Sequence, residues 1–414
     1  MNGSIPKQAE ELVLDASESS RNSTIEKGAI LQYGPFFDRL NSETLASSNS
    51  QFFNLFEYIS LYIHIPFCRR KCPYCHFYSV YDDESIKDRY LQALVREIEQ
   101  KKSLFSKRHI VSLYFGGGTP FLFGVERIKT ILDYFDVVDC EITLEANPES
   151  ISEEKLEEYR AIGVNRLSFG VQSFDQRELQ LLGRCHSVEQ AIQAVHLAKP
   201  FGNISIDLMY ELPGQTLSSW KRTLEQACSL PIQHISLYNL MIEPESAWYR
   251  KKEAIVLPGE QMALAMYEAA VDITSKHGFE QYEISAFSRP GFHSNHNSGY
   301  WIGREFLGFG AAAFSFYNNY RFSNVADIRK YCSEEESVDF SETLTSEERV
   351  RELIAVGLRM NQGVDVAALE EHWGAAAPSL SHLEEAGLLV TKKGRVGLTQ
   401  RGRLLYDAVA AEII

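Results

Sequence analysis

The chain has 414 residues, 44% of them hydrophobic and 23% charged, and it carries a formal net charge of −15 at pH 7. An acidic chain with no basic stripe neutralises few phosphates, which argues against general nucleic-acid binding. Its seven cysteines are odd in number and partly clustered, which excludes the disulfide framework of a small secreted domain. We therefore expect a protein of a reducing compartment, the cytoplasm, with neither a signal peptide nor a bilayer-spanning segment.

The N-terminal region is rich in Ser, Asn and Glu, as in "ASESSRNST" (16–24). A segment of this composition buries too little apolar surface to offset the entropy of ordering it. We therefore expect residues 1–57 to be a mobile extension.

From residue 58 onward, short β-branched and aromatic runs alternate with helix-like segments. Strands separated by helices indicate βα units and a parallel sheet, and so the α/β class. Six such units suit a partial (β/α)6 TIM-like barrel over residues 58–290, with functional residues at the C-terminal ends of its strands. The predicted strands are residues 59–65, 109–115, 140–146, 165–171, 203–209 and 234–240.

The βα alternation weakens near residue 290, and an aromatic-rich connection is expected over residues 291–342. Residues 343–414 are expected to form a helix, a short hairpin and a further helix, which predicts a mainly helical, winged-helix-like C-terminal domain. Acidic and basic residues are roughly balanced there, which favours a packing or partner domain over a DNA-binding one.

Three cysteines lie close together in "PFCRRKCPYCHFYS" (66–79), directly after the first predicted strand: Cys68, Cys72 and Cys75. Thiolates at such spacing bind zinc or an iron–sulfur cluster. A closed zinc site needs a fourth ligand, for which His64 and His76 are candidates. Three ligands on a four-iron cluster leave one iron open for a substrate or cofactor. The spacing favours the cluster, and zinc remains the alternative.

The C-x3-C-x2-C loop after a first strand resembles that of the radical S-adenosylmethionine (SAM) superfamily. This resemblance implies a [4Fe–4S] cluster whose open iron chelates the amino and carboxylate groups of SAM. It also implies that reductive cleavage of SAM yields a 5′-deoxyadenosyl radical, so that the cofactors carry the chemistry.

Further motifs resemble the oxygen-independent coproporphyrinogen III oxidase family within that superfamily. "YFGGGTP" (114–120) follows the second strand, where glycines let the backbone approach a ligand closely, although a tight strand-to-helix turn would also explain them. Polar residues at later strand ends match the family pattern, although each alone could be a hydrogen-bonded structural residue. The resemblance assigns SAM binding to Tyr62, Tyr74, Gly117, Gly118, Thr119, Glu145, Gln172, Arg184 and Asp207.

The position of Phe77 distinguishes two functions within this resemblance. The oxidase motif is C-x3-C-x2-C-x-C, and its fourth cysteine is needed for activity. Phe77 stands in that place here. Because phenylalanine neither ligates a metal nor transfers protons, this departure counts against decarboxylation of coproporphyrinogen.

"HNSGYW" (296–301) resembles the HNxxYW signature of the HemW-type haem chaperones, which bind haem and deliver it to acceptor proteins. The resemblance implies that His296 is a haem ligand, since imidazole is a common axial ligand. A loop histidine hydrogen-bonded to the backbone is the alternative explanation for this residue.

Phe77 and the resemblance to the haem chaperones thus predict a haem chaperone with a SAM-bound [4Fe–4S] cluster that delivers haem to acceptor (respiratory) proteins, with no catalytic residues of its own assigned. No lipid anchor is evident, so any membrane contact is expected to be peripheral. The first alternative is oxygen-independent coproporphyrinogen III oxidase. The second is a zinc-stabilised binding module that ends in a nucleic-acid-reading winged helix.

Overall fold

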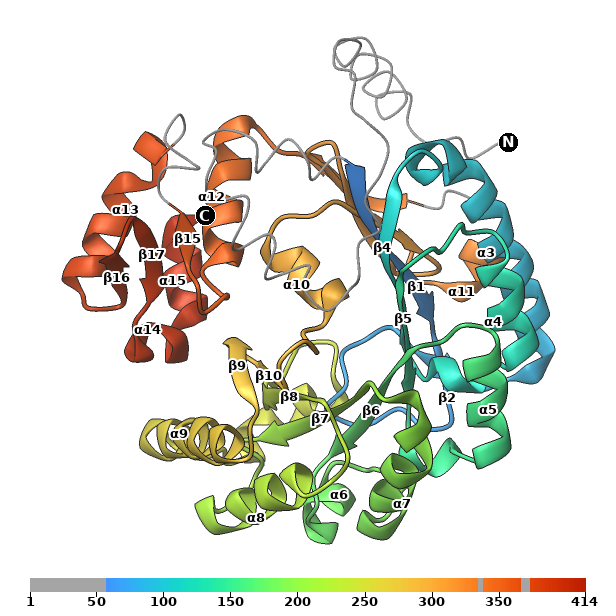
Figure 1. Ribbon diagram of the computed structural model, residues 1–414, viewed down its shortest axis with the longest axis horizontal. Coiled ribbons are helices and arrows are strands. Elements are labelled where there is room, and N and C mark those ends of the chain that lie inside the picture. The colour runs from blue at the N-terminus through green and yellow to red at the C-terminus, as the bar shows by residue number, and fades with distance from the viewer. Residues whose placement is uncertain (1–56, 334–337, 366–372) are drawn as a thin grey trace.

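A computed structural model describes residues 57–333, 338–365 and 373–414 of the chain (Figure 1). The predicted mobile extension, residues 1–57, lies outside the described residues except for its last position. Within the described residues, no helix is both long and apolar enough to cross a membrane.

Six neighbouring parallel strands form the central part of one large sheet, in the order of the chain. They lie within two residues of the predicted limits, and they confirm the partial TIM-like barrel of α/β class (Figure 1). The strands are β1 (Tyr58–Ile65), β4 (His109–Gly117), β5 (Glu141–Ala146), β6 (Arg166–Gln172), β7 (Ile204–Tyr210) and β8 (His234–Asn239).

Helices cover the outer face of this sheet, where alternate strand residues such as Leu61, Ile63 and Ile206 are fully buried. Five of the seven covering helices begin at an Asp, Ser or Thr whose side chain accepts a hydrogen bond from a backbone amide of the first turn. For example, Ser187 caps α7 by accepting a hydrogen bond from the amide of Gln190. The outer helices are α3 (Glu84–Phe105), α4 (Val125–Leu132), α5 (Glu153–Ala161), α6 (Gln176–Leu181), α7 (Val188–Ala198), α8 (Leu217–Cys228) and α9 (Glu260–Lys276).

The intervening strand residues point to the inner face of the barrel, called the lumen below, and they are largely polar. Ser112 on β4 donates a hydrogen bond to Ser60 on β1 at 2.9 Å, and the side chains of Ser205 on β7 and His234 on β8 lie 2.8 Å apart. Because each strand alternates an apolar outer residue with a polar inner one, the lumen is suited to polar ligands rather than to a dry core.

The same sheet continues past both ends of the six parallel strands. β10 (Ala286–Ser288) and β9 (Glu280–Glu283) extend it antiparallel beyond β8, and β11 (Phe306–Phe309) pairs in parallel with β1. β12 (Phe314–Tyr317), β13 (Tyr320–Asn324) and β14 (Val338–Thr343) then add antiparallel strands. The segments 58–290 and 291–342 therefore share one sheet, and the boundary drawn between them stays a prediction.

The C-terminal region has its own apolar core and a small sheet of order β15-β17-β16. β16 (Leu389–Lys392) and β17 (Arg395–Leu398) are joined by Lys393 and Gly394, both at positive φ, which is the geometry of a tight hairpin turn. The predicted helix, hairpin and helix are confirmed. The remaining elements are α12 (Ser346–Gly357), β15 (Val364–Asp365), α13 (Trp373–Glu385), α14 (Gln400–Leu404) and α15 (Tyr406–Ile413).

One short helix, α10 (Asn295–Trp301), lies on the inner side of the sheet, between β4 and the C-terminal region (Figure 1). Ser294 caps it, and the Glu141 carboxylate at the start of β5 accepts hydrogen bonds from the amides of Asn295 and His296. The motif "HNSGYW" thus forms a helix on the lumen side, and not a loop.

Candidate functional site

The cysteine loop extends from the C-terminal end of β1. β2 (Phe67–Cys68) pairs in parallel with β3 (Val80–Tyr81) and so closes the loop on itself. Cys72 and Cys75 form a turn in which the Cys75 amide donates to the Cys72 carbonyl at 3.1 Å. All three thiols are free and half-buried, so the loop presents its sulfur atoms at the mouth of the barrel.

Burial disfavours ionisation of two of these thiols. It raises the pKa of Cys68 to about 11, although a hydrogen bond from Thr119 lowers it in part, and it raises the pKa of Cys75. Thiols in such surroundings become thiolates when a metal centre supplies the compensating positive charge.

The zinc alternative finds no fourth ligand among the nearby histidines. His64 Nδ1 lies 3.0 Å from the Tyr62 hydroxyl, and its Nε2 lies 2.9 Å from the Tyr78 carbonyl, so both ring nitrogens have partners. His76 is exposed, with its ring against that of Phe77. Across residues 57–333, 338–365 and 373–414, no group of three or more His, Cys, Asp or Glu side chains is placed to hold a single metal ion. Three thiols on one open loop fit a larger cluster better, because a cluster separates its ligands more widely.

The glycine loop packs tightly against the cysteine loop. Gly118 and Thr119 donate their amides to the carbonyls of Ile65 and Phe67, at 2.9 and 2.8 Å. A Cβ atom on Gly117, whose φ is +109°, would lie 2.4 Å from the His64 ring, and one on Gly118 would lie 2.6 Å from the Pro66 backbone. The glycines are therefore required by this close approach, which is the tight-turn role, and the same approach places Thr119 beside Cys68.

Glu145 links the glycine loop to the lumen. Its carboxylate accepts hydrogen bonds from the Tyr114 hydroxyl at 2.8 Å and from the Gly117 amide at 3.2 Å. Burial, followed by the charge of Asp207, raises the pKa of Glu145 to about 7. Burial likewise raises the pKa of Asp207 to about 6. Two carboxyl groups that ionise near neutral pH suit a ligand that brings cationic or hydroxyl groups, as SAM does.

Arg184 and Gln172 meet around Gly170 at the end of β6. Arg184 donates to the Gly170 carbonyl at 2.7 Å and to the Cys72 sulfur at 3.5 Å. Gln172 has a positive φ of 70°, and the pairing of β6 with β7 shifts register between Gly170 and Gln172. The Gln172 side chain and the Arg184 guanidinium both lie against Gly170. A Cβ atom on Gly170 would lie 3.0 Å from Gln172 Nε2 and 3.3 Å from an Arg184 nitrogen.

The two predicted tyrosines lie in different parts of this assembly. The Tyr74 ring packs near Trp248 at 6.2 Å between centroids, and the Trp248 amide donates to the Pro73 carbonyl. Tyr62 lies in the lumen, where its ring stacks on Tyr114 at 6.3 Å. The structure thus brings the cysteines, the glycine loop, Glu145, Gln172, Arg184 and Tyr74 together at the barrel mouth, with Tyr62 and Asp207 in the lumen.

His296 lies deep in the lumen, away from the cysteine loop. Its side chain is 2% exposed, its Nδ1 lies 2.9 Å from the Ser112 hydroxyl, and its Nε2 lies 2.9 Å from the Tyr300 hydroxyl. Burial and the charges of Arg304 and Arg166 lower its pKa to about 3, so the ring is neutral. Its partners are side chains, so the alternative of a loop histidine bonded to the backbone was wrong.

Two residues of this site were not predicted. Asn147 donates to the Thr119 hydroxyl and accepts from Arg184, and it stands two residues after Glu145 in "TLEANPE", on the same face of the chain. Arg166 is 2% exposed, and its positive charge offsets part of the rise that burial causes in the pKa values of Glu145 and Asp207. The period of two along each strand is the signal that would have found both.

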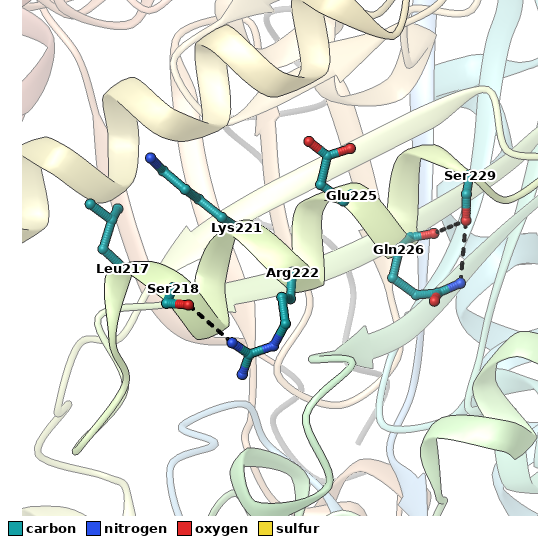
Figure 2. Close-up of a pocket in the computed structure, with 7 residues that line it drawn as sticks. All are labelled: Leu217, Ser218, Lys221, Arg222, Glu225, Gln226 and Ser229. Carbon is teal, nitrogen blue, oxygen red and sulfur yellow. Dashed lines mark hydrogen bonds between the residues drawn. The ribbon is translucent and has the colours of Figure 1, made fainter.

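A surface depression of about 850 Å³ lies on α8, on the outer side of the barrel (Figure 2). Its side chains pair locally, as Arg222 does with Ser218 and Gln226 with Ser229. It shares no residue with the assembly at the barrel mouth, and we assign it no role.

Comparison with known proteins agrees with this geometry. Residues 62–227 match the family model of the radical SAM superfamily, and residues 344–405 match that of the HemN C-terminal domain. The chain is similar to the coproporphyrinogen III oxidase of Escherichia coli, a radical SAM enzyme, with a TM-score of 0.75 and 26% identity over 89% of this chain and 95% of that one.

Curated relatives are more similar in sequence. The heme chaperone HemW of Bacillus subtilis is 36% identical over 84% of this chain and 97% of its own length. The heme chaperone HemW of Lactococcus lactis is 32% identical over 83% and 94%. A mitochondrial radical SAM domain-containing protein 1 of Danio rerio is 32% identical over 84% and 81%. With the cysteine loop, the glycine loop and the lumen carboxylates arranged as above, the chain belongs to the HemW family of radical SAM proteins.

Proposed function

We propose that this protein is a haem chaperone that binds haem and delivers it to acceptor proteins. The names of its relatives in Bacillus subtilis and Lactococcus lactis support this function. The observation in the chain that carries it is Phe77, which is 55% exposed and stands where the oxidase motif has a fourth cysteine.

As a radical SAM protein, the chain takes a [4Fe–4S] cluster and SAM as cofactors. We assign the cluster to Cys68, Cys72 and Cys75, whose thiols share one loop at the barrel mouth. Held by these three thiols, the cluster would supply an open iron for the amino and carboxylate groups of SAM. The residues that would hold SAM are those predicted: Tyr62, Tyr74, Gly117, Gly118, Thr119, Glu145, Gln172, Arg184 and Asp207.

His296 is the proposed haem ligand. A neutral imidazole has the free lone pair that iron requires, and the low pKa of His296 keeps it neutral. The Nε2 atom faces the Tyr300 hydroxyl at 2.9 Å, so ligation requires that this one hydrogen bond be given up. The proposal therefore includes a movement of Tyr300 when haem binds.

A haem titration followed by absorption spectroscopy tests the proposal, and the chain offers a matched control. His234 is also buried in the lumen, with Nδ1 2.8 Å from the Ser205 hydroxyl and Nε2 2.8 Å from the Tyr282 hydroxyl. We expect His296→Ala to weaken haem binding at least tenfold and to change the Soret band, and His234→Ala to do neither. Equal haem affinity in the wild type and in His296→Ala would show that His296 is not the ligand. If the wild type does not bind haem, the proposed function is wrong.

The fold similarity to coproporphyrinogen III oxidase supports a second candidate, the oxidase activity itself. An anaerobic assay with coproporphyrinogen III, SAM and a reductant separates the two. Formation of protoporphyrinogen would favour the oxidase. Absence of product, together with transfer of haem to an apo-acceptor, would favour the chaperone.

The partners and the compartment of the protein are also part of the proposal. The partners are haem and haem-acceptor proteins, with contact to the membrane surface limited to peripheral association. We propose the cytoplasm as the compartment, because all seven cysteines, Cys140, Cys185, Cys228 and Cys332 included, are free thiols.

A further inference from the structure

The Asn147 side chain connects two of the three clustered cysteines through a continuous chain of hydrogen bonds. Its Nδ2 donates to Thr119 Oγ1 at 2.9 Å, and Thr119 Oγ1 donates to Cys68 Sγ at 3.8 Å. Its Oδ1 accepts from Arg184 at 2.5 Å, and Arg184 donates to Cys72 Sγ at 3.5 Å. The path therefore begins and ends on sulfur atoms of the cysteine loop.

The direction of every bond in this path is fixed by chemistry. A guanidinium group can only donate, so the oxygen of the Asn147 amide must face Arg184 and the nitrogen must face Thr119. The Thr119 hydroxyl accepts from that nitrogen, and its own hydrogen is then directed to Cys68. Both arms thus deliver hydrogen-bond donors to sulfur, and the Asn147 amide can donate to one arm while it accepts from the other.

The backbone holds Asn147 firmly in this position. Its carbonyl accepts hydrogen bonds from both the amide and the hydroxyl of Ser150, at 3.0 and 2.7 Å. Arg184 is held independently by the Gly170 carbonyl, and Thr119 is 2% exposed. A fixed amide between two confined partners is suited to setting their orientation.

We propose that Asn147 is a positioning residue that orients Thr119 and Arg184 toward the sulfur ligands of the cluster and thereby raises its reduction potential. Hydrogen bonds and positive charge at the sulfurs stabilise the reduced, more negative form of an iron–sulfur cluster. The inference rests on the proposed assignment of the cluster to Cys68, Cys72 and Cys75. It goes beyond that assignment because Asn147 reaches the cluster only through two other side chains.

The test is an anaerobic redox titration of the cluster-loaded protein, followed by electron paramagnetic resonance, on three variants. Asn147→Leu removes both arms at similar volume. Asn147→Asp keeps the acceptor for Arg184, loses the donor to Thr119 and adds negative charge. The matched control is Asn165→Leu, because Asn165 also bridges two groups, the Ile142 amide and the Cys140 carbonyl, at the start of β5.

We expect both Asn147 variants to lower the ratio of reduced to oxidised cluster at a fixed potential by about threefold to tenfold, and Asn165→Leu to leave it unchanged. A tenfold change corresponds to about 59 mV for one electron. In a Thr119→Val background the effect of Asn147→Leu should shrink, because one of its arms is already lost. Unchanged potentials in both Asn147 variants would overturn the proposal.

Two further outcomes are also decisive. Loss of iron from Asn147→Leu at a wild-type melting temperature would show that Asn147 is needed to retain the cluster and not to set its potential, and would overturn the proposal. Loss of iron with a fall in melting temperature equal to that of Asn165→Leu overturns it, because a merely structural residue gives that result. Retention of the full cluster by Cys72→Ala would instead refute the cysteine assignment, which separates failure of the underlying proposal from failure of this inference.

Discussion

The Nε2 atom of His296 and the Tyr300 hydroxyl lie 2.9 Å apart, one turn apart on the same face of α10. The Tyr300 hydroxyl therefore occupies the position next to Nε2 that the iron of haem would take in the proposed complex. Tyr300→Phe removes this partner and leaves the ring in place, and we expect haem affinity to rise about fivefold, because a hydrogen bond of about 1 kcal/mol no longer has to be broken. The change is read from the haem titration, with Tyr282→Phe, next to His234, as its control.

The stability of the protein without added SAM should depend on pH through Glu145. Burial raises the pKa of this carboxyl in the folded chain to about 7 from an ordinary value of 4.5. Between these two values the folded chain binds more protons than the unfolded chain, so the free energy of unfolding falls as the pH rises. Glu145→Gln removes this pH dependence, because glutamine does not ionise. From pH 5 to pH 8, the free energy of unfolding of the variant should therefore rise by about 1–3 kcal/mol relative to that of the wild type, as measured by thermal unfolding. An equal difference at both pH values would contradict the assignment.

Iron binding should depend on the clustered thiols and not on the others. We expect Cys68→Ala, Cys72→Ala and Cys75→Ala each to lose the cluster absorption after anaerobic reconstitution, while Cys185→Ala, an exposed thiol, keeps it. Iron and sulfide analysis measures this. Full iron content in any of the three clustered variants would mean that its thiol is not a ligand.

Arg359 joins the C-terminal region to the barrel and to α10. Its guanidinium lies 3.1 Å from the Glu283 carboxylate and 4.3 Å from the centre of the Trp301 ring. The Glu283 side chain is 5% exposed, so Arg359→Ala leaves a buried carboxyl without its cation and should cost about 3 kcal/mol in unfolding free energy. Glu283→Gln in the same chain should recover part of this loss.

The control for that experiment is Lys276→Ala. Lys276 pairs with Asp272 on the exposed face of α9, where both side chains are more than half exposed, so the change should cost less than about 1 kcal/mol. Equal losses of unfolding free energy for Arg359→Ala and Lys276→Ala would show that the buried Arg359–Glu283 pair stabilises the protein no more than an exposed pair does.

The sequence predicted the parallel strands well because each is a short run rich in β-branched and aromatic residues, whose outward-facing side chains pack under the outer helices. "NISIDLM" places Ile204, Ile206 and Leu208 outward and Asp207 inward, and the structure has this arrangement. The edge strands after residue 305 were not predicted, because segments such as "GFGAAAFSF" have no clear alternation and are ordered by pairing with distant strands.

The sequence named most of the candidate site residues one by one, but it did not show the hydrogen bonds that connect them. Nothing in "TLEANPE" indicates that Asn147 bridges Thr119 and Arg184, because those partners come from different βα units and meet only when the barrel closes. The burial of His296 was likewise missed, since "HNSGYW" is too short to show a helical period, and Glu141 from β5 supplies the charge that anchors its helix.

The strand that leads into the cysteine loop, β1, is flanked by β4 on one side and by β11 on the other. Residues 306–309, which form β11, are synthesised long after residues 58–65, which form β1. Until then, the backbone groups of β1 that pair with β11 have no partner strand. We therefore expect a chain truncated before residue 306 to retain less iron than the full chain, because β1, which carries the cysteine loop, would lack one of its two neighbours.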